Sequence, residues 1–202
     1  MTGLCDSGCF YCPVSFERKD KDAVYSDEML VSEEDDIIEE AVSIGATGTG
    51  ITGGDPLLNI DRTVSFIRML KARFGPDHHI HLYTATMDAD KAGTLRDAGL
   101  DEIRFHPPEH MWVRLEETPL REIAEMGGMD VGIEVPALPG HEDGLRSLLD
   151  FCDSAAIKFV NLNELEFSES NWHMMEDMKY GVLDETSSAV GGSAVTAAAV
   201  MR

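Results

Sequence analysis

Three cysteines lie close together near the start of the chain, and they are the residues best suited to chemistry. Cys5, Cys9 and Cys12 follow the spacing Cys-x3-Cys-x2-Cys, whereas Cys152 stands far from them. Three neighbouring cysteines would leave one unpaired in a disulfide framework, and a reducing compartment keeps thiols free. Thiolates are good ligands for soft metal ions and for iron–sulfur clusters. The spacing therefore predicts a metal centre.

Two kinds of metal centre remain open from the residues alone. Structural zinc takes four ligands, and one of His78, His79 and His81 could complete such a site, although His79 and His81 also fit an alternating strand. A [4Fe–4S] cluster held by only three thiolates leaves one iron open to a small molecule. A zinc ion or a cluster could serve only structure or redox sensing. A cluster with an open iron could instead bind a substrate or cofactor.

Alternating strand and helix patterns follow the cysteines and must position them. Hydrophobic periodicity and capping residues predict helices at 32–44, 61–75, 88–98, 120–126 and 141–155, and strands at 48–52, 79–84, 102–106, 131–135 and 158–163. Ser32 is the expected N-cap of the first helix. Regular alternation of this kind is typical of a parallel sheet covered by helices.

One face of the predicted sheet is polar, which favours a barrel over an open sheet. His81 and Tyr83 share a face of one strand, Arg104 and His106 share a face of the next, and Glu134 lies on a third. A sheet covered by helices on both sides needs two apolar faces. We therefore expect a closed or partly closed barrel with a polar interior that holds a ligand.

A second motif follows the strand expected at 48–52. The sequence Thr52-Gly53-Gly54-Asp55-Pro56, taken with the three cysteines and with Tyr11 just before the last of them, resembles the radical SAM superfamily. That superfamily carries Gly-Gly-Glu-Pro at this place, so Asp55 is a conservative departure. The resemblance covers residues 2 to about 170. It implies an α/β fold, a partial (β/α)6 TIM-like barrel with mostly parallel strands.

Within the superfamily, the chain looks most like an uncharacterised archaeal group related to the pyruvate formate-lyase-activating enzymes. The likeness is carried by residues 51–58, 79–84, 101–108 and 161–168. It implies that Cys5, Cys9 and Cys12 hold three irons of a [4Fe–4S] cluster, and that S-adenosylmethionine chelates the fourth. Reductive cleavage would then give methionine and a 5′-deoxyadenosyl radical, which abstracts hydrogen from an unknown substrate. The implied partners are a small-molecule or protein substrate and an electron donor such as ferredoxin or flavodoxin.

Further polar residues are candidates for the pocket that this resemblance implies. The cofactor-binding candidates are Tyr11, Gly53, Gly54, Asp55, Pro56 and Glu134. The candidates near the substrate are Arg104, His106, Asn163 and Glu164, with Asn161 and Glu166 beside them. Several have simpler alternatives: a core aromatic for Tyr11, a buried ion pair with Arg104 for Glu134, a hydrogen-bonded core histidine for His106, and a solvated loop for the residues after 160.

The ends of the chain and its charge complete the expectations. Only four residues precede Cys5, so we expect the first strand to be missing or a stub. We expect residues 1–180 to form the barrel and 181–202 an incomplete C-terminal segment. Acidic residues number 38 and basic residues 16, a net charge of −22 that disfavours nucleic-acid and anionic membrane partners and is typical of halophiles. No apolar run spans a bilayer and no signal peptide precedes Cys5, so we expect a cytoplasmic protein.

Overall fold

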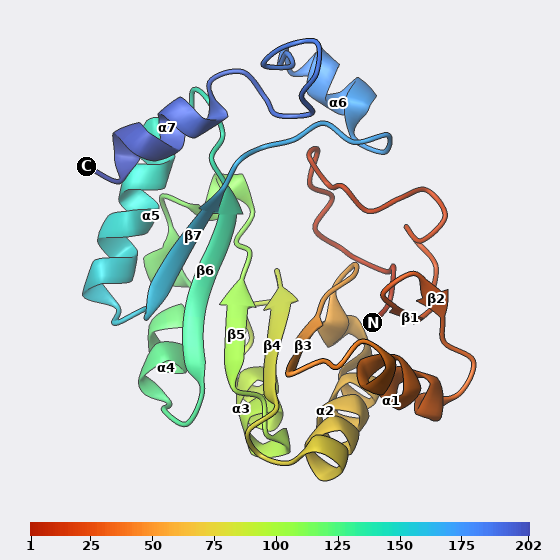
Figure 1. Cartoon of the computed structure of the whole chain (residues 1–202). Coiled ribbons are helices and arrows are strands. Elements are labelled where there is room, and N and C mark those ends of the chain that lie inside the picture. The colour runs from red at the N-terminus through yellow and green to blue at the C-terminus, as the bar shows by residue number, and fades with distance from the viewer.

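The computed structural model describes residues 1–202 and contains one five-stranded parallel sheet (Figure 1). The strands are β3 (Gly48–Ile51), β4 (His79–Thr84), β5 (Glu102–Phe105), β6 (Asp130–Pro136) and β7 (Phe159–Asn163). They lie side by side in the order of the sequence, each parallel to the next. This order is that of consecutive β/α units in a TIM-like barrel. The expected α/β fold and partial barrel are confirmed.

Five helices cover the outer face of the sheet, of which the first precedes β3 and the other four connect successive strands (Figure 1). They are α1 (Glu34–Ser43), α2 (Ile60–Phe74), α3 (Ala89–Ala98), α4 (Leu120–Glu125) and α5 (Glu142–Ser154). The Asp88 side chain caps α3 by accepting a hydrogen bond from the Lys91 amide, and Gly99 ends the helix at a φ of 103°. The expected cap of α1 is wrong by one residue. Glu33 forms a capping box with Asp36 and takes the place predicted for Ser32.

Several short elements lie outside the periodic pattern. They are the hairpin strands β1 (Tyr25–Ser26) and β2 (Met29–Leu30), the 3-10 turns η1 (Pro56–Asn59), η2 (Glu109–Met111) and η3 (Leu115–Glu117), and the helices α6 (Trp172–Asp177) and α7 (Ser193–Val200). The last helix packs on α5, where the Thr196 hydroxyl donates to Glu142 at 2.8 Å and Arg146 donates to the Ala199 carbonyl at 2.9 Å. No helix combines the length and the hydropathy needed to cross a bilayer.

The alternation along the strands separates an apolar core from a polar concave face. The side chains that point to the helices are fully buried, and they include Ile80, Leu82, Ile103, Phe105, Ile133 and Val135. Burying each of them stabilises the fold by about 1.5–3 kcal/mol. The intervening residues Tyr83, Arg104 and Glu134 point to the opposite face and bond to one another. The expected polar interior is therefore present.

The first four residues form no strand but lie along the end of β3. The Thr2 carbonyl accepts from the Gly54 amide at 2.6 Å, and the Leu4 carbonyl accepts from the Asp55 amide at 2.7 Å. The Met1 ammonium donates to the Thr52 carbonyl at 2.8 Å. These bonds attach the first residues to the turn that follows β3.

Candidate functional site

The three neighbouring cysteines lie on a loop at the end of the sheet where the parallel strands finish (Figure 1). Cys5 is exposed, whereas Cys9 and Cys12 are partly buried. Burial raises the pKa of the Cys9 thiol, and the nearby thiols of Cys5 and Cys12 raise it further. All three thiols are free, so the loop offers them together as candidate metal ligands.

The Gly53-Gly54 turn packs directly against the chain that leads into this loop. A Cβ atom at Gly53 would lie 2.4 Å from the Thr2 carbonyl oxygen, and one at Gly54 would lie 2.1 Å from the Leu4 oxygen. Gly53 also has a φ of 138°, which side chains disfavour. From the sequence, we expected Gly53 and Gly54 to bind the cofactor. In the structure, the two glycines first allow the backbone just before Cys5 to approach the turn.

Asp55 is buried, and its carboxylate is occupied by protein donors. One oxygen accepts from the Leu57 amide at 3.0 Å and from the Thr84 hydroxyl at 2.7 Å. The other accepts from the Ala85 and Thr86 amides at 3.2 and 3.1 Å, and from the Thr86 hydroxyl at 2.8 Å. Five donors fill the positions that a carboxylate offers. Asp55 therefore ties the turn after β3 to the turn after β4.

Pro56, the other candidate in this motif, is buried and begins η1 directly after Asp55. Its ring presets a helical φ at a position where an amide hydrogen is not needed. The Thr63 hydroxyl donates to the Pro56 carbonyl at 2.8 Å, which holds the start of η1 against α2. Pro56 thus supports the shape of the turn from behind.

Tyr11 and His106 connect the cysteine loop to the barrel. The Tyr11 hydroxyl lies 2.9 Å from Nε2 of His106, and Nδ1 of His106 lies 2.8 Å from the Glu134 carbonyl oxygen. Burial lowers the pKa of His106, so the ring is neutral at pH 7. Because a carbonyl only accepts, Nδ1 carries the proton and Nε2 accepts from Tyr11. Both ring nitrogens of His106 are hydrogen-bonded within the protein, as in the alternative of a hydrogen-bonded core histidine. The ring holds Tyr11 in place.

Arg104 lies at the centre of the polar concave face. Its guanidinium donates to the Tyr83 hydroxyl at 2.7 Å, to Glu134 at 3.0 Å and to Glu102. All three partners come from the polar positions of β4, β5 and β6, which the parallel register brings side by side. The ion pair between Arg104 and Glu134, expected as an alternative, is present and is mostly shielded from solvent.

Glu134 also accepts hydrogen bonds from two side-chain amides on the last strand. Asn161 donates to one carboxylate oxygen at 3.0 Å and Asn163 donates to the other at 2.8 Å. Burial alone would raise the pKa of Glu134, but the hydrogen bonds from Asn161, Asn163 and Arg104 outweigh it and hold the pKa below its usual range. Glu134 is therefore ionised at neutral pH. Glu164, by contrast, is exposed just after β7 and makes no side-chain hydrogen bond.

Asn171 is a site residue that the sequence interpretation missed. Its side-chain amide is buried and donates to the Tyr11 and Glu166 carbonyls, each at 3.0 Å, while its oxygen accepts from the Ser168 amide at 2.7 Å. The segment after β7 crosses toward the cysteine loop, as Figure 1 shows. An asparagine after serines signals a local turn. No local signal links it to a loop 160 residues away.

Replacing Asn171 with aspartate tests this link. The carboxylate keeps the bond from Ser168 but offers no donor to Tyr11 or Glu166, and it buries a charge beside two carbonyl oxygens. We expect the free energy of unfolding to fall by about 2–4 kcal/mol, with faster hydrogen exchange in the cysteine loop. Urea titration and exchange mass spectrometry measure both effects. The exposed neighbour change Glu169→Gln is the control, and equal protection in both variants would contradict the link.

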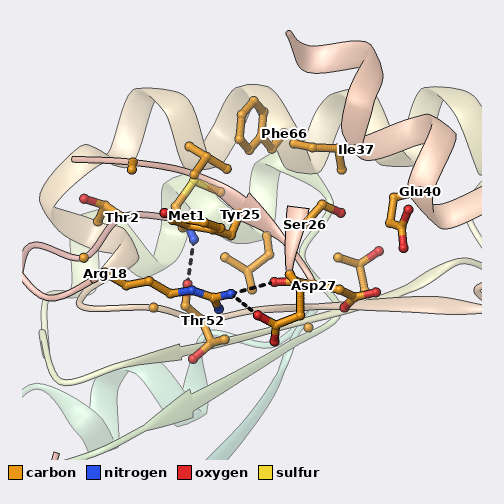
Figure 2. A pocket seen from close by; sticks show the side chains of 18 of the residues that line it. Met1, Thr2, Arg18, Tyr25, Ser26, Asp27, Ile37, Glu40, Thr52 and Phe66 are labelled. Carbon is orange, nitrogen blue, oxygen red and sulfur yellow. Dashed lines mark hydrogen bonds and ion pairs between the residues drawn. The ribbon is translucent and has the colours of Figure 1, made fainter. Parts of the chain in front are cut away.

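A cavity of about 700 Å³ lies beside the free edge of β3 and reaches Thr2 and Gly53 (Figure 2). It is bounded by β3, α1, α2 and the hairpin that follows the cysteine loop, and none of the three clustered cysteines lines it. Arg18 crosses its mouth and bonds to the Asp27 carbonyl at 3.3 Å and to the Glu28 carboxylate. The cavity therefore adjoins the Gly53-Gly54 turn at the outer edge of the sheet, without a lining cysteine.

A partial barrel, a three-cysteine loop at its strand ends and an adjoining Gly-Gly-Asp-Pro turn define a class of enzyme. Residues 1–107 match the family model described as the Radical SAM superfamily. The chain belongs to this superfamily, whose members are enzymes that use a [4Fe–4S] cluster and S-adenosylmethionine. The fold, the family and the cofactors expected from the sequence are thereby confirmed.

Three curated relatives are similar to the chain. A protein of Methanocaldococcus jannaschii provisionally named a glycyl-radical enzyme activating enzyme is 40% identical over 210 residues, which cover 100% of this chain and 56% of that protein. The FO synthase of Mycobacterium tuberculosis strain H37Rv is 31% identical, over 73% of this chain and 18% of that protein. The GTP 3′,8-cyclase of Campylobacter curvus is 28% identical, over 89% and 57%. The chain thus spans little more than half of the M. jannaschii protein, and the expected relationship to activating enzymes is confirmed.

Proposed function

We propose that this chain holds a [4Fe–4S] cluster through Cys5, Cys9 and Cys12 and cleaves S-adenosylmethionine reductively. The observation that carries the proposal is the pair of backbone bonds from Gly54 to Thr2 and from Asp55 to Leu4. Leu4 directly precedes Cys5, so these bonds place Cys5 next to the Gly-Gly-Asp-Pro turn. A cluster on the loop would therefore have the turn beside it. When bound, the cluster and S-adenosylmethionine supply a 5′-deoxyadenosyl radical for hydrogen abstraction.

The residues around the loop would bind and orient this cofactor. We propose that Asp55 acts as a positioning residue, because its carboxylate is already filled by five protein donors. Glu134 has three protein donors, which leaves one acceptor position for a ribose hydroxyl. The Tyr11 ring, fixed through His106, would form an apolar wall beside the cluster. Water exclusion by such a wall protects a reactive radical from side reactions.

The substrate would meet the open side of the polar concave face. We propose Arg104, Asn163 and the exposed Glu164 as the groups nearest to it, since they lie on or just after β5 and β7, the strands on either side of β6. The name of the M. jannaschii relative favours a protein that carries a glycyl radical, whereas the other two relatives favour a small molecule. A ferredoxin or flavodoxin is the proposed electron donor.

Charge and composition support the remaining parts of the proposal. The net charge of −22 disfavours a nucleic-acid substrate and an anionic membrane surface, and it suits a cytoplasmic enzyme of high salt. We propose residues 1–180 as the cofactor-binding barrel, with residues 181–202 as a segment that packs on its outside through α7.

Anaerobic reconstitution with iron and sulfide, followed by reduction, tests the proposed function. We expect the electron paramagnetic resonance signal of the reduced cluster to change when S-adenosylmethionine is added, because the ligand binds the open iron. We also expect 5′-deoxyadenosine and methionine to form in equal amounts. Tightly bound zinc, no cluster and no cleavage would instead support a structural or redox-sensing metal domain.

A further inference from the structure

A second cluster of metal-binding side chains lies at the other end of the barrel, where the strands begin. His79 and His81 belong to β4, and Glu102 is the first residue of β5. Each offers one ligand atom, and these atoms all lie within 4.8 Å of one another. Nε2 of His79 is 3.8 Å from a carboxylate oxygen of Glu102. The cluster is separate from the cysteine loop, which lies where the strands finish.

The backbone register brings these three residues together. His81 lies directly opposite Glu102 in the parallel pairing of β4 with β5. His79 comes two residues earlier on β4 and therefore points to the same face. The arrangement depends on strand pairing rather than on a mobile loop, so the three side chains share one small region of the concave face.

A glycine on the neighbouring strand makes room for the His81 ring. Gly48 and Gly50 of β3 pair with His79 and His81, respectively. A Cβ atom at Gly50 would lie 2.7 Å from Nε2 of His81, so any larger residue would displace the ring, whereas a Cβ atom at Gly48 would lie 2.6 Å from the His79 carbonyl oxygen. The position of the His81 ring in the cluster therefore depends on the glycine at position 50.

The donor set is chemically suited to a cation. His79 and His81 offer imidazole nitrogens, the commonest metal ligands in proteins. One oxygen of Glu102 accepts from Arg104 and the other faces His79. Arg104 opposes a cation, but Glu134 offsets its charge through their ion pair. An imidazole pair with one free carboxylate oxygen is a common ligand set for transition metals.

We propose that His79, His81 and Glu102 bind a divalent transition-metal ion such as Zn²⁺, Co²⁺ or Ni²⁺. Metal–ligand bonds of about 2.0–2.2 Å would bring the three ligand atoms to about 3.4 Å from one another, which requires a shift of about 1 Å or less. His79 is half exposed, so its ring is free to make that shift. Three protein ligands leave further coordination positions for water or a small anionic ligand.

Titration of the full chain with Co²⁺ tests the site, because cobalt spectra separate the two kinds of ligand. Nitrogen and oxygen ligands give visible d–d bands, whereas thiolates add intense near-ultraviolet charge-transfer bands. We expect a d–d signal that persists in the Cys5→Ser/Cys9→Ser/Cys12→Ser variant, which lacks the clustered thiols. If that variant does not fold by circular dichroism, the charge-transfer bands of the wild-type chain still distinguish the two sites.

Single substitutions then assign the ligands. His79→Ala removes an exposed ring and should leave the fold intact, and we expect it to weaken Co²⁺ binding at this site at least about tenfold. Glu102→Gln should have the same effect, while the thiolate bands stay unchanged. The matched control is His173→Ala, which removes a fully exposed histidine that also lies near a glutamate. Equal cobalt binding in the His79→Ala and His173→Ala variants, or a signal that depends only on the cysteines, would overturn the proposal.

Discussion

Replacing Cys9 with alanine is expected to abolish cluster binding, the largest effect that we predict for this chain. Cys9 is the middle cysteine of the proposed centre in sequence, and it is partly buried. Two thiolates would leave two irons of the cluster without protein ligands. Loss of a direct ligand costs more than the 10–100-fold that outer-shell changes cost, so we expect affinity to fall at least about a hundredfold. Iron and sulfide content after anaerobic reconstitution measures the loss directly.

The matched control for this change is Cys152→Ala. Cys152 is buried in α5, and burial raises the pKa of its thiol to about 12, so it stays protonated and inert. We expect this variant to keep its full iron content and to lose only about 1 kcal/mol of stability. A Cys9→Ala protein that retains the same iron content and the same reduced-cluster spectrum as Cys152→Ala would refute the assignment.

The second large effect is expected from Asp55→Asn, which should lower the free energy of unfolding by about 3–5 kcal/mol. The buried carboxylate of Asp55 accepts from five donors on Leu57, Thr84, Ala85 and Thr86. An amide group would turn its own two hydrogens toward some of those donors and leave them unsatisfied. Each buried donor without a partner costs about 1–3 kcal/mol, and more when the lost acceptor was charged. Urea unfolding followed by circular dichroism measures the change.

Two further variants make this result specific. Asp61→Asn changes an exposed carboxylate in the first turn of α2, and we expect it to shift stability by no more than about 0.5 kcal/mol. Asp55→Glu restores the charge with one more methylene, as in the usual form of the motif, and should recover part of the loss. If Asp55→Asn is as stable as Asp61→Asn, the five hydrogen bonds do not hold the turn together.

The order of elements and the position of the three-cysteine loop were predictable because both depend on local patterns. Each strand carries apolar residues at alternate positions, and helix ends such as Asp88 and Gly99 are marked by capping residues. Elements without such signals were missed, including the two-residue strands β1 and β2 and the short helix α6. A strand of two residues is too short for periodicity to identify.

The polar face illustrates what a pattern can and cannot predict. Alternation showed that Tyr83, Arg104 and Glu134 would share one side of the sheet, because side chains repeat every two residues along a strand. It did not show which atoms would meet. The register between strands places Arg104 beside Tyr83 and Glu134 beside Asn161, and register depends on packing of the whole barrel.

By itself, the sequence determined the family, the three cysteines that we propose as ligands of the cluster, and the polarity of the barrel interior. Only the tertiary structure decided how those residues are used. The Asp55 carboxylate, which we expected at the cofactor, accepts hydrogen bonds from the end of β4 and the turn that follows it. The Asn171 side chain, 160 residues further along the chain, donates to the Tyr11 carbonyl. Hydrogen bonds between segments far apart in sequence form only when the parallel strands bring their ends together, and no local spacing records them.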